Sequence, residues 1–128
     1  MKEKIKGSVD IVDFDNDTIR RMLLYMYTDS LEDLQWKSAL RLYEAADKYQ
    51  ILSLMEKCSA FLEDHLTSIN ACDALVLADR HQDNSFKEVV QNYILDRNEY
   101  VFCSEEWKTL LENNFKLAAE TMHKVWKK

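Results

Sequence analysis

A single glycine and no proline in 128 residues limit what this chain can fold into. Average usage is ~7% glycine and ~5% proline, so the two residues that form tight turns are nearly missing. A β-sandwich or barrel needs frequent turn residues, and a phosphate-binding loop needs several glycines at fixed spacing. The sequence therefore argues against both and predicts a helical protein.

Composition narrows the class further. Hydrophobic residues make up 47% of the chain, which is enough for a packed core. The net charge of −6 argues against a nucleic-acid partner, because such binding needs a basic surface. No apolar run approaches the ~18 residues of a membrane span, and no signal peptide is evident. Three cysteines without a C-x-x-C pair indicate reduced thiols. We expect an intracellular protein, of nucleus or cytoplasm, with no membrane partner.

Hydrophobic periodicity predicts an all-α fold, a bundle of about seven short antiparallel helices with one short N-terminal strand. Val9–Asp13 is the expected strand, because its residues alternate at first and are rich in β-branched side chains. A lone strand needs a partner for its backbone groups. Either a second copy or a sheet outside this chain must supply that partner.

The helices are expected where a polar cap precedes apolar residues at helical spacing. The first follows Asp15, and its apolar positions are Ile19, Met22, Leu23 and Met26. The others are expected at about 35–49, 51–66 and 67–81, and after Asp83, Ser104 and Asn114. No internal repeat is apparent along the chain.

The best candidates for a metal site are Cys58, His65, Cys72 and His81. Zinc ligands usually come in pairs on one turn or hairpin, whereas these four stand singly on or between different helices. Cys58 and Cys72 also fall at apolar core positions, which free cysteine prefers. We therefore expect no metal or other cofactor, with a small helical metal-binding protein as the less favoured alternative.

Cys103 is the candidate nucleophile, because it precedes Ser104, the expected cap of a helix whose N-terminus would stabilise a thiolate. Its neighbours Val101 and Phe102 indicate burial, and no paired histidine is evident. Acidic pairs such as Glu105–Glu106 fit the first turn of a solvated helix. Because no set of nucleophile, base and orienting group is present, we do not expect an enzyme.

Three stretches of the chain resemble a known family. Val9–Asp13 followed by Ile19–Asp29 resembles the fourth strand and following helix of a BTB/POZ domain. Leu42–Ile51 resembles the Ala-Ala-Asp-Lys-Tyr phrase of that domain's next helix. Leu66–His81, with Trp107 further on, resembles the 3-box, a shortened BACK module, of speckle-type POZ proteins. This resemblance divides the chain into 1–65, the C-terminal part of a BTB/POZ domain, and 66–128, a 3-box or BACK-like helical module.

The resemblance implies a protein-interaction module. In that family, the BTB and 3-box regions recruit cullin-3, which makes the protein a substrate adaptor of a ubiquitin ligase. Met1 carries over as the apolar plug and Glu3 as its acidic companion in a hydrophobic-x-Glu element. Asp47 and Tyr49 fall in the Asp-Lys-Tyr phrase on the same cullin-facing surface.

The second module would add to that surface. The helix pair around Leu75 and Tyr93 resembles the 3-box groove that receives the N-terminal extension of the cullin. The early strands of the BTB domain and a MATH domain have no counterpart in this chain, so the resemblance begins inside the BTB domain. Asp29 also stands where the family usually has glycine. The alternative is a truncated regulatory paralogue that forms homo- or hetero-oligomers through the 3-box without recruiting cullin.

Overall fold

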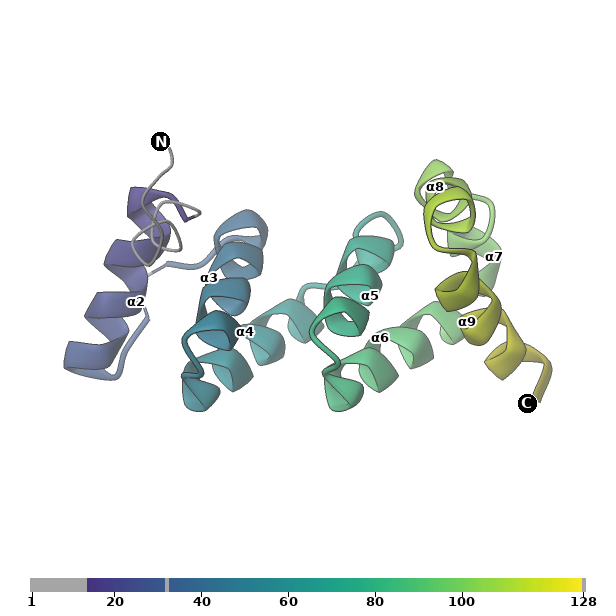
Figure 1. The fold of residues 1–128 in the computed structure, drawn as a ribbon. Helices are drawn as coiled ribbons and strands as arrows, with labels where there is room; N and C mark the ends of the chain where they lie inside the picture. The colour runs from purple at the N-terminus through teal and green to yellow at the C-terminus, as the bar shows by residue number, and fades with distance from the viewer. Residues whose placement is uncertain (1–13, 32, 128) are drawn as a thin grey trace, which may run out of the picture. The chain divides into compact units, whose positions relative to one another are not determined.

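The computed structural model describes residues 14–31 and 33–127, and only the backbone of residues 125–127 (Figure 1). Within these residues every regular element is a helix, which confirms the all-helical class. The helices are α2 (Asn16–Thr28), α3 (Trp36–Lys48), α4 (Leu52–Asp64), α5 (Ala71–Arg80), α6 (Asn84–Asp96), α7 (Asn98–Val101), α8 (Glu105–Asn113) and α9 (Phe115–Lys127). The strand expected at Val9–Asp13 lies outside the described residues and stays a prediction. No helix in the described part of the chain is long and apolar enough to cross a membrane.

Polar caps begin four of these helices where the sequence predicts them. The side chains of Asp15, Asp83, Ser104 and Asn114 each accept a hydrogen bond from the backbone N–H three residues later, at 2.8, 3.3, 3.1 and 3.3 Å. Such caps satisfy donors that the first turn of a helix leaves unpaired. Asp29, in the position of the expected glycine, ends α2 with a left-handed φ of 57°. Local side-chain chemistry therefore sets these helix boundaries.

Two helices differ from the sequence-based expectation. Helix α5 begins at Ala71, later than the cap expected at Thr67. Thr67 and Asn70 exchange hydrogen bonds between backbone N–H and side-chain oxygen at 2.7 and 3.1 Å, so Thr67 caps the turn that leads into α5. The short helix α7 was not predicted, because four residues are too few to show a helical period.

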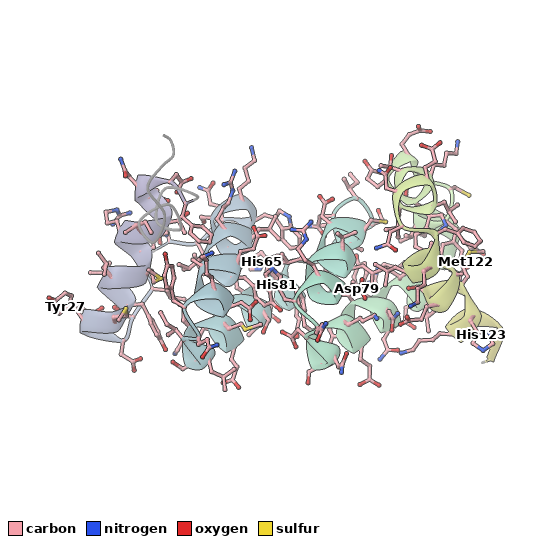
Figure 2. All side chains as sticks on the ribbon, in the orientation of Figure 1. Tyr27, His65, Asp79, His81, Met122 and His123 are labelled. Carbon is pink, nitrogen blue, oxygen red and sulfur yellow. The ribbon has the colours of Figure 1, made fainter. Side chains whose placement is uncertain are left out.

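The buried face of α2 is only partly the one predicted. Its buried residues are Thr18, Met22 and Tyr25, of which Met22 was predicted. The hydroxyl groups of Tyr25 and Ser53 lie 2.8 Å apart, so a hydrogen bond ties this face to α4. Leu23 and Met26 are 47% and 61% exposed, and the prediction that they face the core is wrong. Tyr27, near the end of α2, also projects into solvent (Figure 2).

The chain divides into two compact units, residues 1–62 and 63–128. In the first unit α2 packs on α3 over a core that includes Leu42, Tyr43, Leu54 and Cys58. In the second, α5 packs on α6 and α8, and α9 packs on α6 and α8. That core includes Leu75, Phe86, Ile94 and Trp107. Each unit therefore has an apolar core of its own.

Within each of the helix pairs α3–α4 and α5–α6, the two helices are joined by a three-residue turn of the same type. In these turns Gln50 and Gln82 have left-handed φ values of 58° and 54°. The residue after each glutamine donates its N–H back to an alanine carbonyl, Ile51 to Ala46 at 2.8 Å and Asp83 to Ala78 at 2.9 Å. This bond from beyond the helix to its last turn defines a Schellman motif. Both helix ends therefore form in the same way, with glutamine in the place where glycine is usual.

The sequences of the two pairs match at one constant offset. Ala-Asp-Lys-Tyr-Gln at 46–50 corresponds to Ala-Asp-Arg-His-Gln at 78–82. The same offset carries buried residues onto buried residues: Leu42, Tyr43, Leu54, Cys58 and Leu62 correspond to Ala74, Leu75, Phe86, Val90 and Ile94. The expectation of no internal repeat is therefore wrong. It failed because the only run of identical residues is short and lies at the turn, while most of the corresponding core residues are of different types.

A polar network ties three helices of the second unit together. Lys87 of α6 places its Nζ 3.0 Å from Oδ1 of Asp79 on α5 and 2.9 Å from Oε2 of Glu120 on α9. The hydrogen bond from Lys87 lowers the pKa of Glu120. Burial alone would lower the pKa of Lys87, but its hydrogen bonds to Glu120 and Asp79 raise it overall. Lys87 and Glu120 are therefore both charged at neutral pH.

A Glu120→Gln variant should lose less stability in acid than the wild type. Because the folded chain holds the pKa of Glu120 below its ordinary 4.5, its stabilising effect is complete above that pH and is lost as pH falls through the lowered value. Glu63 and Asp73, whose pKa values are raised mainly by burial, are present in both proteins. Urea unfolding followed by circular dichroism between about pH 3 and 7 measures the difference. An equal loss of stability in acid in both proteins would contradict this role of Glu120.

Candidate functional site

The predicted partner-facing residues of the first unit divide into two groups. Met1 and Glu3 lie outside the described residues, and their roles stay predictions. Asp47 and Tyr49 lie together at the C-terminal end of α3. Asp47 is half-buried in the last turn of the helix, and Tyr49 is its C-cap residue. The structure therefore brings these two predicted residues to one place.

The backbone around Tyr49 is held by several hydrogen bonds. The N–H of Tyr49 donates to the carbonyl of Ala45 at 3.0 Å, and the N–H of Gln50 donates to the carbonyl of Asp47 at 3.2 Å. With the bond from Ile51 described above, these contacts fix the reversal from α3 into α4. These hydrogen bonds therefore fix the backbone from which the side chains of the turn project.

Two aromatic rings are in contact at this turn, and an exposed leucine follows it. The ring of Phe14, which precedes α2, lies 6.3 Å from the ring of Tyr49 at an interplanar angle of 52°. Tyr49 remains 36% exposed, and Leu52, the first residue of α4, is 67% exposed. We call Phe14, Asp47, Tyr49 and Leu52 the α3–α4 corner. Sequence reasoning missed Phe14 and Leu52 because no periodic pattern marks them.

The two predicted residues of the second unit have different environments. Leu75 on α5 is fully buried, so it lies in the core and does not present its side chain to a partner. Tyr93 on α6 is half-buried, and the guanidinium carbon of Arg97 lies 4.2 Å from the centre of its ring. This distance is typical of a cation–π contact. Of the two, Tyr93 is the residue that a partner can reach.

The three cysteines have separate environments. Cys58 and Cys72 are buried, as their apolar positions predict. Burial raises the pKa of each of these two thiols to about 12, so they remain protonated and unreactive. Cys103 is exposed, and the expectation that it is buried is wrong. Val101, two residues before Cys103, lies in the core.

The described residues contain no group of three histidine, cysteine, aspartate or glutamate side chains that could hold a metal ion. An open polar hollow of about 420 Å³ does lie beside the first turns of α2 and α3. Asp15, on its wall, is occupied in capping α2. Asp17 is bonded to Arg20 and Arg21 at 3.0 and 2.8 Å. We therefore ascribe its acidic wall to helix capping and local ion pairs.

Comparison with known proteins identifies a family and several relatives to which the chain is similar. Residues 1–66 match the family model of the BTB/POZ domain. Human Kelch-like protein 6 is 32% identical over 127 residues, which are 99% of this chain and 19% of that protein. Mouse TD and POZ domain-containing protein 3 is 30% identical, over 98% of this chain and 34% of the relative. BTB and MATH domain-containing protein 42 of Caenorhabditis elegans is 25% identical, over 98% and 31%. The chain thus spans about a fifth to a third of these relatives.

Proposed function

This chain belongs to the BTB/POZ domain family, and we propose that it acts as a protein-interaction module that recruits cullin-3 within a ubiquitin ligase. The match over residues 1–66 is the observation that carries this proposal. The relatives align with 98–99% of the chain, which supports a BTB part followed by a 3-box or BACK-like module over residues 66–128. In this role the chain supplies no chemistry, and it raises the effective concentration of a ligase near its substrate in the nucleus or cytoplasm.

The α3–α4 corner supports the proposal for the cullin-facing surface. Protein interfaces typically join an apolar anchor to a polar rim, and tyrosine is enriched among residues that carry binding energy. Tyr49 provides a partly exposed ring on a firm turn, and Asp47 provides an acidic group beside it. We assign Met1 and Glu3 to the same surface by family resemblance. On the second module, Tyr93 is the proposed contact.

An Asp47→Leu variant should bind the N-terminal region of cullin-3 at least about tenfold more weakly than the wild type, as expected when one interface residue of moderate importance is lost. A Met1→Lys variant should weaken binding in the same direction, because a charge replaces the proposed apolar plug. The measurement is isothermal titration of the whole chain. Glu112→Leu, which removes an exposed acid from α8, is the matched control and should bind like the wild type. Absence of wild-type binding at high micromolar concentration would refute cullin recruitment.

Exposed apolar side chains in the second unit favour one alternative. Ile69, Tyr100 and Phe115 are all largely exposed, and such residues can support self-association. A regulatory paralogue that forms oligomers through residues 66–128 would use them without binding cullin. Light scattering across a dilution series distinguishes the two functions. Concentration-dependent dimers in a chain that does not bind cullin would favour the alternative.

A further inference from the structure

The internal repeat indicates which residues at the α3–α4 corner the fold itself requires. The α5–α6 pair forms the same Schellman turn, with the same aspartate and glutamine, yet it places His81 where the first pair has Tyr49. It also places Asn84 where the first pair has Leu52. Asn84 and Leu52 are both exposed first residues of a 13-residue helix. A polar side chain therefore satisfies the fold at this position.

The requirements of the fold therefore do not explain why this position carries a leucine. A single exposed leucine is ordinary on a protein surface. Leu52, however, lies three residues from Tyr49, and both differ from the polar residues of the second pair in the apolar direction. The ring of Tyr49 is also in contact with the ring of Phe14. Tyr49 and Leu52 thus stand at a turn whose counterpart has the polar residues His81 and Asn84, and Phe14 lies beside Tyr49.

We propose that Leu52 is a partner-contacting residue of the α3–α4 corner and that Phe14 is a positioning residue that holds the ring of Tyr49 for the same partner. This inference rests on the proposed function, and it names the occupant as the N-terminal region of cullin-3. The partner presents an apolar side chain to Leu52 and Tyr49 and a basic or hydrogen-bond-donating group to Asp47. Leu52, three residues after Tyr49, adds exposed apolar area to the α3–α4 corner, and residues that carry binding energy tend to cluster at an interface.

The role of Phe14 follows from its contact geometry. A tyrosine that is one-third exposed has rotamer freedom to lose when a partner binds, and a ring packed beside it removes part of that freedom in advance. The 6.3 Å separation and tilted arrangement are within the range of favourable aromatic pairs. Phe14 is itself half-buried, so it acts on the partner through Tyr49.

The test of Leu52 is the Leu52→Asn variant, which installs the residue that α6 uses at the same position. We expect unchanged thermal unfolding and about tenfold weaker binding to the cullin-3 N-terminal region in isothermal titration. Tyr27→Asn is the matched control, because Tyr27 is also an exposed residue of the first unit, 89% exposed, and lies outside the α3–α4 corner. It should bind like the wild type. Wild-type affinity in Leu52→Asn, or an equal loss in Tyr27→Asn, would overturn the inference while leaving cullin recruitment intact. A wild-type chain that does not bind would overturn the proposed function and, with it, the occupant named here.

The test of Phe14 is a double-mutant cycle with Tyr49. Phe14→Ala should weaken binding several-fold in the wild type and have no further effect in Tyr49→Ala, because the ring that it positions is then absent. Phe14→Tyr keeps an aromatic ring and should restore binding. Circular dichroism checks that each variant is folded. Equal losses from Phe14→Ala in both backgrounds would overturn the positioning role.

Discussion

Replacing Trp107 with alanine should destabilise the second unit by about 3–5 kcal/mol, the range observed for large aromatic residues in protein cores. Trp107 is the largest of the fully enclosed side chains among the described residues and is 2% exposed. Its ring lies 4.6 Å from the ring of Phe102, so the variant loses an aromatic contact as well as buried area. Urea unfolding followed by circular dichroism measures the change.

Phe115→Ala is the control for this experiment. It removes an aromatic ring from the same unit, but the ring is mostly exposed, so stability should change by no more than about 0.5 kcal/mol. If the free energy of unfolding of Trp107→Ala is within about 1 kcal/mol of the wild-type value, Trp107 is not central to the stability of this core.

Removing the hydroxyl group of Thr121 should cost about 1–3 kcal/mol, because it leaves a buried amide without its main partner. The Nε2 atom of Gln91 donates to Oγ1 of Thr121 at 3.1 Å, and both residues are buried between α6 and α9. The other contact of the Gln91 Nε2 atom, to Oε2 of Glu120, is longer at 3.4 Å. Thr121→Val keeps the shape of the side chain and removes the acceptor, so the loss reports on the hydrogen bond.

The double variant separates this hydrogen bond from packing. In Gln91→Leu the hydroxyl of Thr121 still donates to the carbonyl of Leu117 at 3.0 Å, so we expect a smaller loss than in Thr121→Val. Combining both changes replaces the polar pair by apolar groups of similar size and should recover most of the stability. Strictly additive losses in denaturant unfolding would show that the two residues do not form a coupled pair.

Local chemistry made much of the fold predictable. Asp15, Asp83 and Ser104 precede apolar periodic segments, and each side chain caps its helix because the chemistry needs only residues three positions apart. Asp29 likewise adopts the left-handed backbone that its place after Tyr-Thr suggests. These features depend on near neighbours in the sequence, which a single chain displays.

Features that depend on distant neighbours were not predictable in the same way. The face that α2 buries depends on the hydrogen bond of Tyr25 to Ser53, 28 positions further along the chain. The contact between Phe14 and Tyr49 likewise joins residues that no periodic pattern relates. The left-handed Gln50 and Gln82 were unexpected because glutamine has no intrinsic preference for that conformation. Of the candidate site, the family phrase revealed Asp47 and Tyr49, whereas Leu52 emerged only from the repeat.

The most direct test of the account is to map the partner-binding surface on the intact chain. A ¹⁵N-labelled sample is titrated with the N-terminal region of cullin-3, and amide shifts are followed by NMR. We expect saturable shifts concentrated at residues 47–53, which run from the end of α3 through the turn into α4. No shift at a saturating concentration of the cullin region, or shifts that leave residues 47–53 unaffected, would contradict this expectation.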